Sequence, residues 1–134
     1  MIHFRSWLSA LPKVELHLHL EGAIPLPALL ELIGKYGGDE DVKTLDQLRT
    51  RLTYADFPAF IDAWIWKNGY LREYEDFSFI AQAMAEELKR QNILYAESFF
   101  SPTRFAHHSL EPQGLAAALR SGLDRVNGVT VRLI

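Results

Sequence analysis

The chain has 134 residues and contains no cysteine. This absence excludes disulfides, thiolate metal sites and cysteine nucleophiles. It also excludes the cysteine-ligated zinc of the cytidine-type base deaminases. It does not fix the compartment, because bacterial periplasmic proteins can also lack cysteine.

Long hydrophobic runs and blocks of one charge are missing as well. No apolar stretch approaches the roughly 18 to 20 residues of a membrane helix, and Arg5, Pro12 and Lys13 interrupt the apolar residues near the N-terminus. We therefore expect no signal peptide, no membrane partner and a cytoplasmic location. The 14 basic and 17 acidic residues give a formal charge of -3, and because neither sign is clustered we expect no nucleic acid partner.

The composition that remains is that of a folded domain, with 49% hydrophobic and 23% charged residues. Hydrophobic periodicity predicts helices over residues 25–36, 44–51, 56–70, 75–90 and 112–126, and strands over residues 13–20, 92–100 and 129–134. This succession favours a parallel α/β sheet with right-handed crossovers. Internal repeats and Gly/Ser linkers are absent, and the third strand ends the chain. We therefore expect residues 1–134 to be a single incomplete domain, the N-terminal part of a (β/α)8 barrel.

The first predicted strand alternates strictly between apolar and polar residues. The apolar residues form one face: Val14, Leu16, Leu18 and Leu20. The polar residues form the other face: Glu15, His17 and His19. Because His17 and His19 are two residues apart, both imidazoles project from one face, roughly 6 to 7 Å apart along the strand.

Two imidazoles on one face can converge on a single ion. A catalytic zinc site needs three or four protein ligands, so His17 and His19 would be half of one. The alternative is a solvent-facing polar edge of an amphipathic strand. The Glu-Gly turn that follows, and the burial expected of both faces of a parallel sheet, disfavour this alternative.

Two stretches of the sequence resemble the adenosine deaminase family. Residues 12–22, PKVELHLHLEG, are similar to the family's opening signature, which ends the first barrel strand. Residues 95–102, YAESFFSP, are similar to its second strand, although Phe99 stands where many members carry Arg. Two matching motifs are far more specific than a histidine pair alone.

The resemblance implies a zinc-dependent hydrolytic deaminase of an adenine-containing nucleoside or base, in which His17 and His19 bind the metal. In the family a third His and an Asp complete the metal sphere, and a Glu and another His transfer protons. All four are expected after Ile134, so no catalytic acid or base is expected within this chain. The implied chemistry is attack of an activated water on the purine carbon that bears the amino group, with loss of ammonia.

The resemblance also implies a set of substrate-binding residues: His19, Glu21, Gly22, Phe57, Phe60 and Trp64. A carboxylate after the histidine pair can accept a hydrogen bond from a ribose hydroxyl, or it can simply solvate the turn. Gly22 would let the backbone pass close to metal or ligand, or would only serve a strained turn. The three aromatic residues lie at helical spacing, which is also typical of a stripe that packs into the core.

Two further interpretations concern charged residues. Glu97 lies in a strand expected to be buried, so we expect it to form an ion pair with Arg132 on the adjoining strand. His3, His107 and His108 fit no ligand spacing with the histidine pair, and we expect them on the surface.

Two alternatives to a deaminase remain open from the sequence. A histidine pair at the end of the first strand also occurs in amidohydrolases that cleave amides, lactones or phosphotriesters. In these enzymes later strands usually contribute a carbamylated Lys or a second metal. The other alternative is a chain that is inactive alone and associates with its missing barrel half or with a second copy. The open edge that would drive such association carries Val129, Val131 and Leu133.

Overall fold

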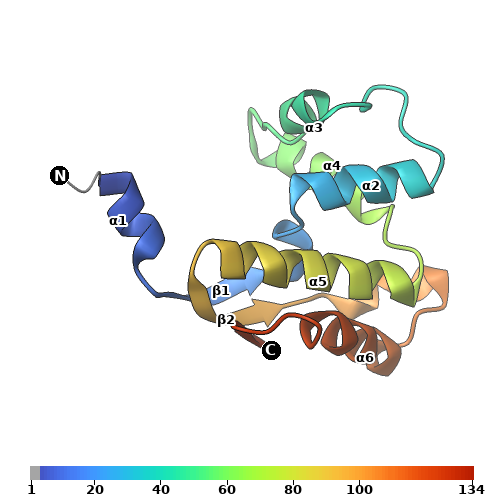
Figure 1. Ribbon diagram of the computed structural model, residues 1–134. Coiled ribbons are helices and arrows are strands. Elements are labelled where there is room, and N and C mark those ends of the chain that lie inside the picture. The colour runs from blue at the N-terminus through green and yellow to red at the C-terminus, as the bar shows by residue number, and fades with distance from the viewer. Residues whose placement is uncertain (1–3) are drawn as a thin grey trace.

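The computed structural model describes residues 4–134 as a three-stranded parallel sheet with helices packed around it (Figure 1). The strands are β1 (Lys13–His19), β2 (Ile93–Phe99) and β3 (Thr130–Leu133), in the spatial order β1-β2-β3. Both neighbouring pairs are parallel. The predicted parallel α/β sheet is therefore confirmed, and each strand lies where the periodicity places it.

Helices occupy most of the remaining described chain: α1 (Phe4–Ala10), α2 (Leu26–Lys35), α3 (Leu45–Arg51), α4 (Phe57–Asn68), α5 (Tyr74–Arg90) and α6 (Pro112–Leu123). Two 3-10 turns, η1 (Leu20–Gly22) and η2 (Pro102–His108), follow β1 and β2. The helices α2 to α6 were predicted, whereas α1 and η2 were not. Among the described residues, no helix has both the length and the apolar character required to cross a bilayer.

Capping side chains determine where two of these helices begin. Thr44 starts α3 with a capping box, in which its hydroxyl accepts a hydrogen bond from the Gln47 N–H (3.3 Å) and Gln47 Oε1 accepts one from the Thr44 N–H (3.1 Å). Asp56 starts α4 by accepting a hydrogen bond from the Ala59 N–H at 2.9 Å.

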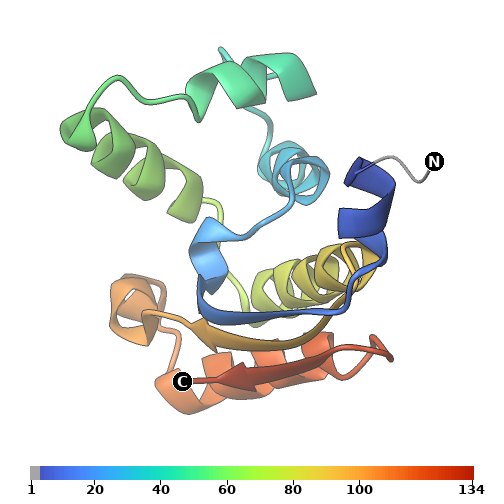
Figure 2. The same cartoon turned by 90° about the vertical axis from the view of Figure 1, so that its left-hand side faces the viewer.

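The helices α5 and α6 pack together along one face of the sheet (Figures 1 and 2). Buried residues of the strands meet that layer, among them Ala96 of β2 and Val131 of β3, which are direct neighbours. The largest buried side chains of the two helices complete this core: Phe77, Ile80, Met84, Leu115 and Leu119. The opposite face of the sheet, with Tyr95 and Phe99 of β2, is only half-buried.

The strict alternation predicted for β1 is wrong. The register against β2 shifts between Glu15 and Leu18, so that β1 uses one more residue than β2 over this stretch. Such a bulge changes the face on which the following residues lie. Val14 and Leu16 are exposed on this outer strand, whereas Leu18 is half-buried beside the fully buried Ser98.

The predicted ion pair between Glu97 and Arg132 is not formed. The two residues are direct neighbours across β2 and β3, but the Glu97 carboxylate accepts a hydrogen bond from the Tyr95 hydroxyl at 2.9 Å. Ion pairs within residues 4–134 do not include Glu97. Because Glu97 is only half-buried and Arg132 is exposed, solvent can screen both charges and no buried pair is required.

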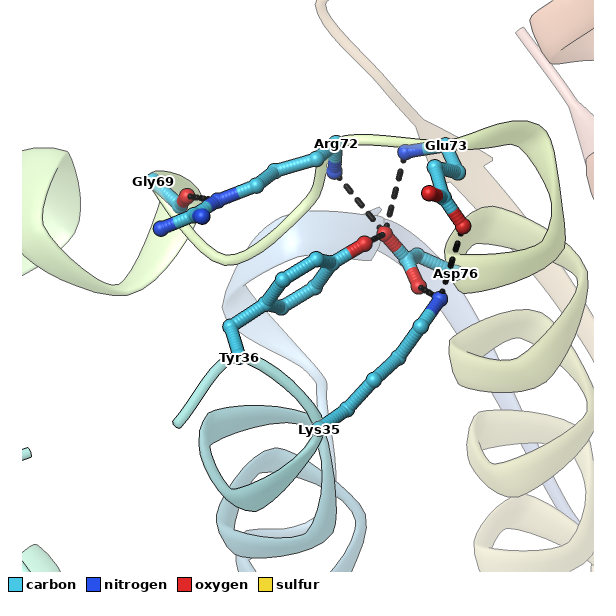
Figure 3. A network of polar contacts seen from close by, with 6 residues as sticks. All are labelled: Lys35, Tyr36, Gly69, Arg72, Glu73 and Asp76. Carbon is cyan, nitrogen blue, oxygen red and sulfur yellow. Dashed lines mark hydrogen bonds and ion pairs between the residues drawn. The ribbon is translucent and has the colours of Figure 1, made fainter. Parts of the chain in front are cut away.

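A buried carboxylate fastens the end of α2 to the start of α5 (Figure 3). The Asp76 side chain is 1% exposed, and it accepts hydrogen bonds from Lys35 Nζ and from the Tyr36 hydroxyl, both at 2.6 Å. It also accepts from the backbone N–H groups of Arg72 and Glu73, at 2.9 and 3.0 Å. This network holds the helical excursion from α2 to α4 against the helix layer that covers the sheet.

Candidate metal and substrate site

The two histidines of β1 lie together on the open face of the sheet. Their ring centroids are 5.2 Å apart, with the ring planes at 57°, and both residues are exposed. The predicted placement of both rings on one face is therefore confirmed. Because α5 and α6 cover the other face, the histidine face is the one that turns inward in a (β/α)8 barrel, whose helices lie outside.

An aromatic residue of the neighbouring strand backs the histidine pair. The ring of Phe99 stacks on His17, with centroids 4.6 Å apart and planes at 30°, and its centroid lies 5.9 Å from that of His19. His19 and Phe99 are direct neighbours across β1 and β2. The stacking restricts the orientation of the His17 ring.

The histidine pair fits a metal ion as two of its ligands. With zinc–nitrogen bonds of about 2.1 Å and a tetrahedral angle, two imidazole centroids would lie roughly 5.4 Å apart. The observed separation is 5.2 Å, and neutral imidazole is a preferred donor for zinc. Within residues 4–134, no group of three His, Asp or Glu side chains is close enough to hold an ion, so the described residues do not form a complete metal site.

Glu21 follows the histidines in η1 and is fully buried, at 0% exposure. Its Oε1 accepts a hydrogen bond from the Ser101 N–H at 2.8 Å, and its backbone carbonyl accepts one from Lys67 Nζ. Its second carboxylate oxygen, Oε2, is buried and has no partner among the described residues. The interpretation of Glu21 as a carboxylate that solvates a surface turn is therefore wrong. One buried acceptor, two residues after His19 in the chain, thus has no donor among the described residues.

Lys67 joins the site from α4, and the sequence analysis missed it. The residue is 6% exposed, and its Nζ lies 4.3 Å from the ring centroid of Trp64. Burial lowers the pKa of Lys67 to about 8, although the nearby charge of Glu21 acts to raise it. A signal was present in the sequence: Lys67 lies three residues after Trp64 and seven after Phe60, on the same helical face.

The three aromatic residues predicted to contact substrate form a row along α4. Ring centroids are 5.9 Å apart both between Phe57 and Phe60 and between Phe60 and Trp64. Phe57 is 71% exposed, whereas Phe60 and Trp64 are half-buried. The row therefore does not fill the core, and it leads along α4 to Trp64, beside η1. Contact of these rings with a substrate remains a prediction.

Gly22 lies where Trp64 and His19 approach η1. A Cβ built on Gly22 would meet the Trp64 ring at 3.4 Å and the His19 Cβ at 3.6 Å, which are ordinary contacts. Its φ is not in the left-handed region, so the interpretation of Gly22 as a strained turn is wrong. Its close approach to a metal or ligand stays a prediction.

The remaining histidines lie apart from the pair. His107 is exposed, as expected, but His108 is half-buried, and its Nε2 is enclosed without a partner among the described residues. Burial lowers the pKa of His108, and the neighbouring His107 lowers it further. The prediction for His3 lies outside the described residues.

The parallel strands, with helices on one face and the histidine pair on the other, have the arrangement of the first part of a (β/α)8 barrel. Comparison with known proteins makes the class more specific: residues 12–134 match the family described as adenosine deaminase. The chain belongs to the adenosine deaminase family.

Sequence relatives and a solved structure agree with this assignment. The chain is 32% identical to the aminodeoxyfutalosine deaminase of Acidothermus cellulolyticus, over 94% of this chain and 36% of the relative. It is also 32% identical to the adenine deaminase of Pseudomonas fluorescens, over 96% of this chain and 42% of the relative. An amidohydrolase from Burkholderia ambifaria, solved with bound zinc, superposes with a TM-score of 0.80 at 26% identity, over 100% of this chain and 38% of that structure. The chain thus spans about two fifths of the length of these proteins, and its fold is the N-terminal portion of their barrel.

Proposed function

We propose that the protein containing this chain hydrolytically deaminates an adenine-containing nucleoside or base, with a zinc ion held in part by His17 and His19. The observation that carries the proposal is the pair of imidazoles, 5.2 Å apart on the open face at the end of β1. The names of the relatives, adenine deaminase and aminodeoxyfutalosine deaminase, support the substrate class. In the cytoplasm, such an enzyme would act in purine metabolism.

Within this proposal each candidate site residue has a definite task. His17 and His19 hold the ion, and a zinc ion so held would lower the pKa of a water molecule toward neutrality. Glu21 Oε2, buried and without a described partner, accepts a hydrogen bond from the substrate. Gly22 and the row Phe57, Phe60 and Trp64 bound the space that the purine occupies. Residues 1–134 are the N-terminal part of a single barrel domain, and proton transfer falls to groups after Ile134 in the same domain.

The proposal is tested by measuring ammonia release from adenosine, adenine and a thioether analogue of adenosine by the intact protein. We expect turnover of at least one of the three, with zinc bound, and loss of both zinc and turnover in His17→Ala. His107→Ala removes an exposed histidine away from the pair and is the control, expected to keep both. Absence of ammonia release from all three substrates by the zinc-loaded protein would contradict the proposal.

A further inference from the structure

Lys67 is buried in surroundings that offset little of the cost of burying a charge. The ammonium donates a hydrogen bond to the Glu21 carbonyl and lies over the Trp64 ring. Among residues 4–134, no carboxylate forms an ion pair with Lys67 within 4.0 Å. A desolvated ammonium without a close counter-charge is unfavourable.

An uncharged side chain could fill the same space. Replacement of buried charges by apolar residues of similar volume is often neutral or stabilising, and methionine matches lysine in length and flexibility. Packing of α4 on η1 therefore does not by itself require an ammonium at Lys67. The stability of the fold therefore does not explain why residue 67 carries a charge.

The surroundings of Glu21 provide this explanation. Ser101 fixes Oε1 from the end of β2, and Lys67 fixes the backbone carbonyl of the same residue from α4. Glu21 is thus held at two points, its carboxylate by the Ser101 N–H and its backbone carbonyl by Lys67. Its Oε2 is left without a described partner.

Lys67 also connects two groups of candidate substrate contacts. The Trp64 ring lies under its ammonium and against Gly22, so the aromatic row of α4 and the turn after the histidines meet at Lys67. We propose that Lys67 is a positioning residue, which holds Glu21 with Oε2 free as a substrate acceptor and ties the aromatic row to η1. The inference rests on the proposed function and names a residue that determines how the substrate binds.

The test compares Lys67→Met, which removes the charge, with Lys67→Arg, which keeps it, in the intact protein. Because positioned contacts of this kind act on bound substrate and transition state alike, their loss is expected mainly in KM. We expect Lys67→Met to raise KM at least tenfold, with kcat within threefold, bound zinc unchanged and a thermal midpoint no lower than that of the wild type. Lys67→Arg should keep KM within threefold. Lys43→Met removes an exposed charge and should change none of these values.

Hydrogen exchange gives a second readout that does not need turnover. The Ser101 amide is bonded to Glu21 Oε1, so its exchange should accelerate at least tenfold in Lys67→Met and stay unchanged in Lys67→Arg. If the wild type releases no ammonia but Ser101 responds in this way, the proposed function fails and the positioning role stands. Unchanged KM and unchanged Ser101 exchange in Lys67→Met would overturn the inference. If Lys67→Met instead loses bound zinc and has both a lower kcat and a lower thermal midpoint, the inference is also overturned. That result would show that Lys67 only supports the fold.

Discussion

Two buried carboxylates in this chain use their hydrogen-bonding capacity very differently. Asp76 accepts four hydrogen bonds through its two oxygens, whereas Glu21 uses Oε1 and leaves Oε2 without a described partner. A buried polar atom without a partner is costly, of the order of 1 to 3 kcal/mol. At the scale of the residue, Asp76 therefore supports the fold. Glu21 is where we expect a group of the substrate to bind, at Oε2.

Asp76→Asn should show the structural role of the first carboxylate. The asparagine amide has one acceptor oxygen, so it cannot accept the hydrogen bond from Lys35 together with those from Tyr36 and the two backbone N–H groups. We therefore expect a loss of about 3 kcal/mol in the free energy of unfolding at pH 7. Urea unfolding of the intact protein measures the difference. The control is Asp46→Asn, because the Asp46 side chain is 91% exposed in its ion pair with Arg49, and it should cost less than about 1 kcal/mol. Equal losses in the two variants would contradict this account.

The same variant should report the pH dependence of the network. Burial raises the pKa of Asp76, but hydrogen bonds from Lys35, Tyr36 and two backbone amides lower it more, so that the net pKa lies below the ordinary value. A lowered carboxyl pKa stabilises the fold above the pKa of the unfolded chain, and this contribution is lost as the pH falls through the folded pKa. The stability difference between wild type and Asp76→Asn should therefore shrink when unfolding is measured below about pH 4.

At the scale of the element, the packing of α5 on α6 depends on one close approach. A Cβ on Gly122 of α6 would overlap the Ser78 carbonyl oxygen of α5 and lie 2.9 Å from the carbonyl carbon. Backbone atoms cannot yield as a flexible side chain can. The distance between these two helices is therefore set by the absence of a side chain at Gly122.

Gly122→Ala should consequently destabilise the protein by at least about 2 kcal/mol, because α6 must shift away from α5. Gly34→Ala in α2 is the matched control, since a Cβ there has no atom within 4 Å. Alanine is the better helix former by up to about 1 kcal/mol, so Gly34→Ala should raise the thermal midpoint slightly. A Gly122→Ala protein as stable as Gly34→Ala would show that the two helices can separate without cost.

The elements show how far the sequence could predict this fold. Periodicity located the strands and the helices α2 to α6. The helices α2, α5 and α6 turn apolar faces to the core, whereas the apolar stripe that predicted α4 includes the exposed Phe57 and Ile65. Periodicity failed at the bulge in β1, which depends on the register with β2 and has no local signal between Glu15 and Leu18. It also missed α1, although Phe4, Trp7 and Leu8 lie at helical spacing. None of the residues of α1 is buried in the described chain.

The candidate site was predictable only in part. The spacing of His17 and His19 predicted both rings on one face, and the rings do lie together, although the register with β2 shifts between Glu15 and Leu18. The contacts of Glu21 with Ser101 and Lys67 join residues 80 and 46 positions apart. Such contacts depend on the crossovers, and no local pattern indicates them.

At the scale of the whole molecule, the described sheet has two outer strands and an open face. Large apolar side chains remain exposed on the strands, including Val14 at 62%, Leu16 at 58% and Leu94 at 49%. Unpaired outer strands and exposed apolar residues favour association with another chain.

We therefore expect the 134-residue chain, produced alone, to self-associate and to release no ammonia from adenine or adenosine. Sedimentation velocity over a range of concentrations measures the association, and a coupled assay measures the ammonia. The intact protein serves as the reference in both measurements. A 134-residue chain that stays monomeric and deaminates either compound would refute this expectation.

The two crossovers of the sheet differ greatly in length, and this difference bears on the entropic cost of docking each outer strand. Residues 20–92 separate β1 from β2, whereas residues 100–129 separate β2 from β3. Closing the longer loop costs more chain entropy, by about 0.6 kcal/mol for each doubling of length, so β1 is the strand whose docking is the more expensive. Since β1 carries both imidazoles, an ion that binds them would favour its docking, and occupancy of the metal site and completion of the sheet would be thermodynamically linked.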